Sequence, residues 1–149
     1  MLSITVDCPM VREAGPNKVR QPAEVAAQCG ELSRAGQELF IVLDLDTKNR
    51  IIDKRLVSMG LLDASLVHPR EVFRGAIANS AAAVILAHNH PSGDTTPSAE
   101  DLSVTRQLVE AGRILGIRVL DHVIIGRPLP EHPTGYMSLR EAGLASFEG

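Results

Sequence analysis

Aromatic residues and basic charge are both scarce in this sequence. It contains no tryptophan, one tyrosine and three phenylalanines in 149 residues, so a surface that stacks nucleic-acid bases is hard to assemble. The formal net charge is −3, whereas proteins that grip the phosphates of nucleic acids usually show a basic excess or a basic run. Direct nucleic-acid binding is therefore not predicted.

Long apolar runs and paired cysteines are missing as well. Apolar stretches such as residues 81–87 are far too short to cross a bilayer, so we expect no membrane insertion. Cys8 and Cys29 do not form a CxxC pair, and residues 1–20 lack the basic start and apolar core of a signal peptide. We therefore expect reduced thiols in a cytoplasmic protein, since a Cys8–Cys29 disulfide needs a secretory route.

The composition that remains, 44% hydrophobic and 22% charged, suits one globular domain. Residues 1–20 are predicted to be an irregular segment with a short edge strand at residues 4–6, and residues 21–149 to be the domain. Strands are expected at residues 38–46 and 51–59, forming a hairpin, and at residues 83–87 and 117–125. Helices are expected from Pro22 to Gly36, from Pro69, over residues 98–115, and briefly from the capping-box spacing of residues 138–141.

This order of strands and helices predicts an α/β fold with helices packed on a mixed sheet. Helical spacing also predicts which side chains the first two helices bury. These are Val25, Cys29 and Leu32 in the first helix, and Val72, Phe73, Ala76 and Ile77 in the second.

The segment HNHPSGDTTPSAED, residues 88–101, carries the candidate chemistry. His88 and His90 are two apart in extended chain, so both imidazoles point the same way. They follow the carboxyl end of a short buried strand, where α/β folds commonly place their chemistry. Imidazole nitrogen is a favoured ligand for zinc. With Asp101, the segment offers three protein ligands, the number that catalytic zinc sites use while leaving a fourth position for water.

Asp101 is predicted to face the core from the first turn of the long helix. At about 100° per residue, Thr105, Leu108 and Gly112 share its side of the helix, and Glu100 is turned away. A carboxylate that faces inward is costly unless it is paired, hydrogen-bonded or bound to a metal.

Structural explanations of these residues stay open at this point. Ser98-x-x-Asp101 is also the pattern of a capping box at a helix N-terminus, and His88 and His90 alone are also compatible with a polar loop. His122 is expected to be a packed, hydrogen-bonded histidine in an apolar strand, and the alternative is a group that orients a ligand or lines the cleft. Ser58 is expected to be an ordinary strand residue, and His68 is expected to help begin a helix.

The pattern resembles the JAMM motif of the JAB1/MPN metalloprotease superfamily. His88-x-His90-Pro91 followed by Ser98-x-x-Asp101 has the spacing of that motif. The longer string of residues 88–101 is similar to the RadC branch in particular, together with Asp121-His122-Val-Ile-Ile-Gly126 and His68-Pro-Arg-Glu71. The resemblance covers roughly residues 18–144, nearly the whole chain.

The resemblance implies a curved mixed sheet flanked by helices, an architecture similar to that of cytidine deaminases. It implies Zn²⁺ held by His88, His90 and Asp101, and a zinc-dependent hydrolase, a peptidase or isopeptidase, that cleaves a peptide or protein substrate with zinc-activated water. The upstream glutamate of the motif aligns with Glu38, which is expected to exchange protons with the water and the leaving amine. The motif serine matches Ser98, which is expected to stabilise the oxyanion.

Two departures from the family pattern keep alternatives open. Many superfamily members have glycine three residues after the glutamate, where this sequence has Ile41, and Glu38 is otherwise explained as a surface charge at a strand edge. RadC proteins often carry a helix-hairpin-helix region before this domain, and 149 residues leave no room for one.

The alternatives are a noncatalytic MPN-type interaction module and a DNA-repair-associated factor. A nucleoside deaminase is not expected without H-x-E and P-C-x-x-C. The sequence predicts no oligomeric state.

Overall fold

The computed structural model describes residues 18–59 and 67–147 of the chain. The strand predicted at residues 4–6 and the thiol of Cys8 lie outside the described residues. Within these ranges, five strands form one sheet in the order β2-β1-β3-β4-β5. The strands are β1 (Leu39–Leu45), β2 (Ile51–Met59), β3 (Ala83–Asn89), β4 (Arg118–Ile125) and β5 (Tyr136–Ser138).

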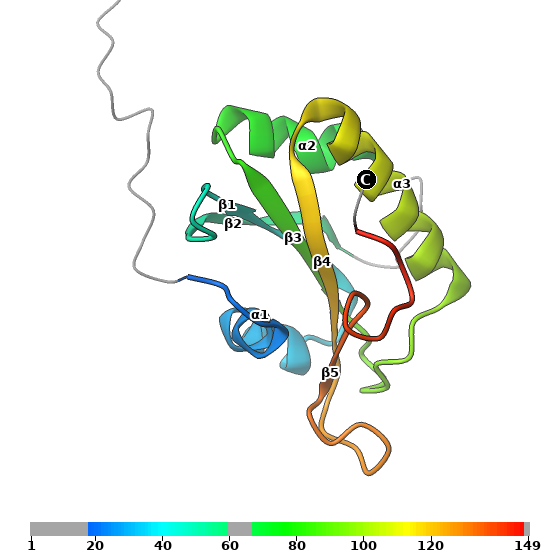
Figure 1. Cartoon of the computed structure of the whole chain (residues 1–149). Coiled ribbons are helices and arrows are strands. Elements are labelled where there is room, and N and C mark those ends of the chain that lie inside the picture. Colours follow the sequence, from blue (N-terminus) through cyan, green and yellow to red (C-terminus); the bar gives the residue numbers. More distant parts are fainter. Residues whose placement is uncertain (1–17, 60–66, 148–149) are drawn as a thin grey trace, which may run out of the picture.

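Helices cover both faces of this sheet (Figure 1). Helices α2 (Pro69–Ala78) and α3 (Ala99–Leu115) lie on one face, and α1 (Pro22–Gln28) with the 3-10 helix η2 (Gly30–Arg34) lies on the other. β1 is antiparallel to β2 and β3, β3 is parallel to β4, and β5 is antiparallel to β4. The predicted α/β fold with a mixed sheet flanked by helices is confirmed, and so is the β1–β2 hairpin.

Strict alternation along β1 divides the core into two layers. Phe40 and Val42 pack with residues of α2 and α3, whereas Ile41, Leu43 and Leu45 pack with residues of α1 and η2. Because both faces of the strand are buried, its sequence is a nearly continuous hydrophobic run rather than an alternating one.

One irregularity in β4 decides which side chains face α3. Val84 of β3 pairs with Val119 and Ile85 pairs with Asp121, so Leu120 is an extra residue in the ladder. A bulge of this kind shifts the alternation of all later residues. Val119 and His122 therefore face the same layer although three positions separate them, and the imidazole of His122 points to α3.

The first helix is shorter than predicted. Its α-helical part ends at Gln28, Cys29 has φ −113° and ψ 29°, and a 3-10 turn continues from Gly30. Glycine has a low helix propensity, which explains the change of geometry at this point. The predicted apolar face is still buried, because Val25, Cys29 and Leu32 are each 1% exposed or less.

Two other predictions are corrected. In α2 the buried residues are Val72, Phe73 and Ala76, whereas Ile77 is 56% exposed at the margin of the stripe. The predicted final helix is a single turn after β5. The Ser138 hydroxyl accepts from the backbone N–H of residue 141 at 3.0 Å, as a cap would. Gly143, at φ 68°, then ends the turn, because this left-handed conformation closes helices instead of extending them.

None of the helices in residues 18–59 and 67–147 has the length and apolar character needed to span a membrane.

Gly112 allows α3 to lie close to β4. A Cβ atom here would be 2.3 Å from the carbonyl oxygen of Ile117 and 3.1 Å from the ring of Phe73. We expect Gly112→Ala to lower the free energy of unfolding in urea by about 1–3 kcal/mol, because overpacking outweighs the better helix propensity of alanine. Gly30→Ala is the matched control, since its Cβ meets nothing within 4 Å. Equal stability of the two variants would contradict this account.

Candidate metal centre

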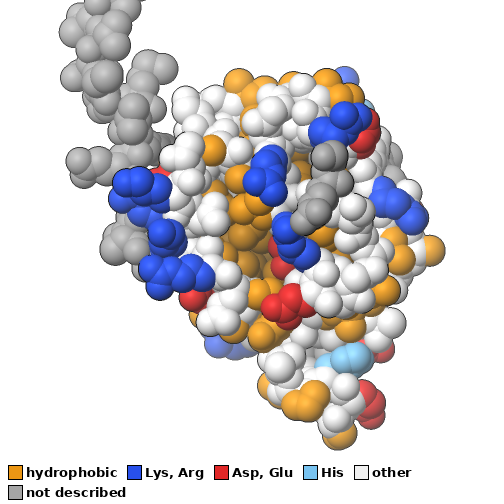
Figure 2. Space-filling view, viewed as in Figure 1, with side chains coloured by type: hydrophobic (Ala, Val, Ile, Leu, Met, Phe, Trp, Pro, Cys, Tyr) orange, Lys and Arg blue, Asp and Glu red, His pale blue; other side chains and the backbone are white. Residues whose placement is uncertain are grey.

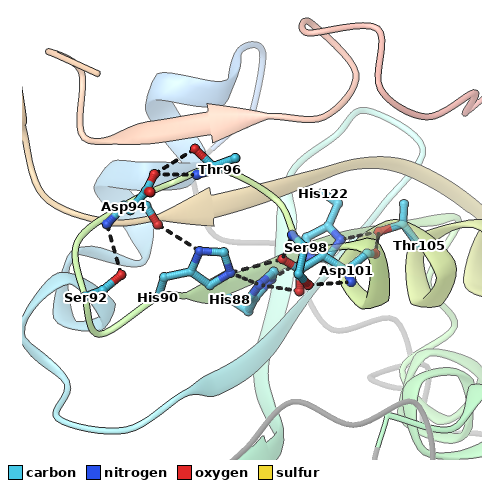
Figure 3. A network of polar contacts seen from close by, with 9 residues as sticks. All are labelled: His88, His90, Ser92, Asp94, Thr96, Ser98, Asp101, Thr105 and His122. Atoms are coloured by element: carbon cyan, nitrogen blue, oxygen red, sulfur yellow. Dashed lines mark hydrogen bonds and ion pairs between the residues drawn. The ribbon is translucent and has the colours of Figure 1, made fainter. Parts of the chain in front are cut away.

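Three potential ligand groups meet between the end of β3 and the start of α3 (Figure 3). His88 lies near the end of β3, His90 follows the strand directly, and Asp101 lies in the first turn of α3. The side chains of His88 and Asp101 are 1% and 2% exposed, and that of His90 is 16% exposed. His88 and Asp101 therefore form the buried side of the cluster, and His90 is the member that reaches the surface.

The potential ligand atoms of the three residues, including both oxygens of Asp101, are close to one another. His88 Nε2 is 3.2 Å from His90 Nε2 and 3.1 Å from Asp101 Oδ1, and His90 Nε2 is 3.0 Å from Asp101 Oδ2. A tetrahedral ion with bonds of about 2 Å keeps its ligand atoms roughly 3.3 Å apart. The nitrogen and oxygen donors and their spacing thus fit one ion, and this cluster could hold a metal.

The outer ring nitrogens of both histidines already have partners. His90 Nδ1 lies 2.8 Å from the carbonyl oxygen of Asp94, which can only accept, so Nδ1 donates and Nε2 remains as the ligand nitrogen. His88 Nδ1 lies 2.6 Å from Nε2 of the buried His122. Outer hydrogen bonds of this kind orient metal-binding histidines in proteins.

Burial and the carboxylate together set the protonation of the cluster. Burial alone would raise the pKa of Asp101, but the hydrogen bonds with His88 and His90 hold that pKa well below its usual value. Burial alone would lower the pKa of His90, but the bonds to Asp101 and to the Asp94 carbonyl raise it. Burial, followed by the charge of His88, holds the pKa of His122 well below its ordinary value, which keeps that ring neutral.

Ser98 is the N-cap of α3 and still has a proton to donate. Its hydroxyl accepts from the backbone N–H of Asp101 at 3.0 Å, and Asp101 Oδ2 accepts from the backbone N–H of Ser98 at 2.8 Å. The capping box is therefore present, and the same carboxylate also belongs to the His88–His90–Asp101 cluster, which could hold a metal. Among the described residues, no acceptor takes the hydroxyl proton of Ser98.

Glu38 lies just before β1, beside the cluster. Its negative charge contributes to the raised pKa of His90. Asn89 holds the flanking backbone, because its Oδ1 accepts from the N–H of Leu39 at 2.7 Å and its Nδ2 donates to the carbonyl of Gln37 at 3.0 Å. The residue between the two histidines thus anchors the chain on both sides of Glu38.

The sequence alone predicts no role for two residues of this network, Asn89 and Thr105. The Thr105 hydroxyl donates to the carbonyl oxygen of Asp101 at 2.7 Å and lies 2.6 Å from His122 Nδ1. Their positions in the sequence could have indicated these contacts. Thr105 follows Asp101 by four residues and so lies on the same helix face, and Asn89 lies between two candidate ligands.

His122, His68 and Ser58 have the structural contacts expected of them. His122 is fully buried and hydrogen-bonded in β4. His68 Nδ1 accepts from the N–H of Arg70 at 3.1 Å as the N-cap of α2, and Ser58 pairs with Phe40 in the sheet.

Hollows occur elsewhere on the molecule. One of about 630 Å³ lies between α1 and β4, with Val25, Ile85 and Leu120 among its apolar lining and Arg118 and Arg140 among its charged lining. Figure 2 shows its hydrophobic floor and charged rim. A second hollow of about 630 Å³ lies along α2. Neither of these two hollows is lined by His88, His90 or Asp101.

Comparison with protein-family models matches residues 19–144 to the RadC-like JAB domain. The chain belongs to this family. The RadC-like JAB domain thus accounts for most of the sequence, including every residue of the ligand cluster.

Curated relatives of this RadC-like JAB domain are named UPF0758 proteins. One from Symbiobacterium thermophilum is 60% identical over 107 residues, which are 72% of this chain and 43% of that protein. One from Methanosarcina acetivorans is 48% identical over 132 residues, 88% of this chain and 55% of that protein. One from Rubrobacter xylanophilus is 47% identical over 136 residues, which are 91% of this chain and 57% of that protein. The chain spans about half the length of these relatives, and their names state no reaction.

Removal of the Asp101 charge should strongly weaken metal binding by this RadC-like JAB domain. We expect Asp101→Asn to weaken the affinity for a divalent ion by roughly 100-fold or more, since even residues behind the ligands are commonly worth 10-fold to 100-fold. Glu100→Gln is the matched control, because the adjacent Glu100 carboxylate is exposed. Isothermal titration with Zn²⁺ and Co²⁺ measures both affinities. Full binding by Asp101→Asn would remove this cluster as the metal site.

The protonation of His90 should depend on Asp101. In the metal-free protein we expect His90 to titrate above its ordinary value of about 6.5, and Asp101→Asn to shift it below that value because burial then dominates. A histidine pKa raised by folding stabilises the protein below the unfolded pKa, and this stability is lost as pH rises through the folded pKa. An NMR titration of the imidazole signals measures the shift. An unchanged His90 titration in the variant would contradict this electrostatic account.

Proposed function

We propose that this RadC-like JAB domain is a zinc-dependent hydrolase, a metallopeptidase that cleaves peptide or isopeptide bonds in a protein or peptide substrate. The observation that supports this most directly is the convergence of two imidazole nitrogens and one carboxylate, each 3.0–3.2 Å from the next. His88, His90 and Asp101 would hold the ion.

The donor set favours zinc among the divalent ions. Two imidazoles and one carboxylate are a known catalytic zinc ligand combination, and they leave a fourth position open. When bound, zinc supplies a Lewis acid that polarises a carbonyl group and makes water a nucleophile near neutral pH. The exposed edge of His90 is the side from which a substrate would approach.

Glu38 is proposed as the general base and acid. Its carboxylate would accept a proton from the attacking water and return it to the leaving amine. The charge of Glu38 already acts on His90, and Asn89 fixes the backbone of the residues on both sides. A base attached to an anchored strand start keeps its distance to the reacting bond, which supports this role for Glu38.

Ser98 is proposed to stabilise the oxyanion. Its hydroxyl uses an oxygen lone pair to cap α3, which leaves the proton to donate to the oxygen on which negative charge develops. Donors held in place before the reaction lower the barrier without reorganising. The cap itself supplies this restraint, since it fixes the hydroxyl relative to Asp101.

We infer that the protein acts in the cytoplasm and that the thiol of Cys29 takes no part in the reaction. Cys29 is a free, buried thiol, and burial raises its pKa to about 11. A thiol in this state is a poor nucleophile at neutral pH. The proposed chemistry therefore depends on the metal cluster rather than on the thiol of Cys29.

Substitution of the proposed base should separate catalysis from metal binding. We expect Glu38→Gln to reduce cleavage by about 100-fold to 10,000-fold while the protein still binds one Zn²⁺, because Glu38 would move a proton without being a ligand. Glu110→Gln, on the exposed side of α3, is the control and should keep full activity. Cleavage is measured by mass spectrometry on a peptide library and on isopeptide-linked conjugates.

Two outcomes would contradict different parts of this proposal. Full turnover by Glu38→Gln would remove Glu38 as the base while leaving the metal site intact. A zinc-loaded wild-type protein that cleaves neither peptide nor isopeptide bonds in these pools would count against the hydrolase and in favour of a noncatalytic interaction module.

A further inference from the structure

A line of buried hydrogen bonds extends behind His88 and returns to the backbone of Asp101 (Figure 3). His88 Nδ1 is 2.6 Å from His122 Nε2, His122 Nδ1 is 2.6 Å from the Thr105 hydroxyl oxygen, and that hydroxyl is 2.7 Å from the carbonyl oxygen of Asp101. His88, His122 and Thr105 are each 0% exposed, so bulk solvent does not reach these bonds.

The end of this line determines where its protons lie. The Asp101 carbonyl can only accept, so the single hydroxyl proton of Thr105 is donated to it. Toward His122 the Thr105 oxygen must then accept, which puts a proton on His122 Nδ1. A neutral imidazole carries one proton, so His122 Nε2 is an acceptor and His88 Nδ1 must donate to it.

The consequence concerns His88 Nε2. With its proton on Nδ1, a neutral His88 has its lone pair on Nε2, the atom that lies 3.2 Å from His90 Nε2 and 3.1 Å from Asp101 Oδ1. Three bonds therefore select the one tautomer of His88 that can bind a metal at this position. The other tautomer would place a proton between the ligand atoms and leave two bare nitrogens facing each other at 2.6 Å.

Packing restricts the same two rings to these positions. Phe40 stacks on His88 with a centroid distance of 5.9 Å and meets His122 edge-on at 5.5 Å. The extra residue Leu120 in β4 turns His122 toward α3, where Thr105 lies one helical turn after Asp101. β1, β3, β4 and α3 thus each contribute to the orientation of one imidazole.

We propose that His122, oriented by Thr105, is a positioning residue that selects the metal-binding tautomer of His88. This inference rests on the proposed metal function of the cluster. The partner behind His88 is a neutral imidazole, whereas ligand histidines are usually backed by a carboxylate, a backbone carbonyl or water. Among the described residues, Asp101 is therefore the one carboxylate in direct contact with the two histidines. Its single negative charge would leave a bound divalent ion with a net positive charge.

The tautomer can be observed directly in the full chain without any metal. Two-bond ¹H–¹⁵N correlation spectra distinguish a protonated ring nitrogen from a bare one. We expect His122 to carry its proton on Nδ1 and to have a bare Nε2. A proton on His122 Nε2 would overturn the inference, because His88 would then have no acceptor behind it.

Matched variants test whether the tautomer matters for metal binding. His122→Gln retains an amide oxygen that can accept from His88, whereas His122→Leu removes the acceptor at similar volume. Thr105→Ser and Thr105→Val form a second pair with and without the hydroxyl. We expect His122→Leu and Thr105→Val to weaken Zn²⁺ affinity about 10-fold to 100-fold, and His122→Gln and Thr105→Ser to stay within about threefold of the wild type.

Zn²⁺ affinity is measured by competition with a chromogenic chelator, and the stability of each metal-free variant by urea unfolding. Leu43→Val, in the core layer on the other face of the sheet, is the control for destabilisation alone and should leave the affinity unchanged. If His122→Leu does not fold, the Thr105 pair gives the same answer. Wild-type affinity in both His122→Leu and Thr105→Val would overturn this inference alone. A wild-type protein that binds no Zn²⁺ would instead overturn the proposed metal function and this inference with it.

Discussion

The carboxylate of Asp101 is the group on which the rest of the site depends. It is 2% exposed, and a buried charge is tolerated only when donors surround it. The backbone N–H of Ser98 donates to it, and the Nε2 atoms of His88 and His90 lie 3.1 Å and 3.0 Å from its oxygens, close enough to share a proton or a cation with the carboxylate. Since the same carboxylate caps α3, the start of this helix and the ligand cluster form one structural unit, and α3 cannot shift relative to β3 without breaking both.

The surrounding scaffold keeps this unit rigid by close contacts between regular elements. Gly112 brings α3 against the backbone that leads into β4, and the extra residue Leu120 turns His122 toward the cluster. Asn89 ties the start of β1 to the end of β3. Sites carried by strands and helices hold their geometry better than sites on loops. Of the three cluster residues, only His90 belongs to a connecting segment, where the carbonyl of Asp94 restrains its ring.

This concentration of buried polar groups bears on the choice between an enzyme and an interaction module. A scaffold gains stability by burying apolar side chains, whereas buried imidazoles and carboxylates cost stability unless every donor and acceptor is satisfied. Here His88, Asp101, Thr105 and His122 lie among apolar side chains, which include valine, leucine, isoleucine, alanine and phenylalanine. Such an arrangement supports the proposed metal chemistry better than a role confined to surface contacts. The net charge of −3 gives no support to a DNA-binding factor.

Local patterns in the sequence were enough to predict β1 to β4, the main helices and the grouping of His88, His90 and Asp101, but they did not predict the short strand β5. The ligands lie within 14 residues of one another, from His88 to Asp101, so strand alternation and helix periodicity determine their directions. The capping-box spacing of residues 138–141 predicted a final helix, but only a single turn forms after β5, because the left-handed backbone of Gly143 ends it. The role of His122 could be decided only by the tertiary structure. That histidine is 34 positions from His88, and a bulge in β4 decides which face of the sheet it occupies. Contacts of this kind depend on strand register and helix packing, which no short-range periodicity encodes.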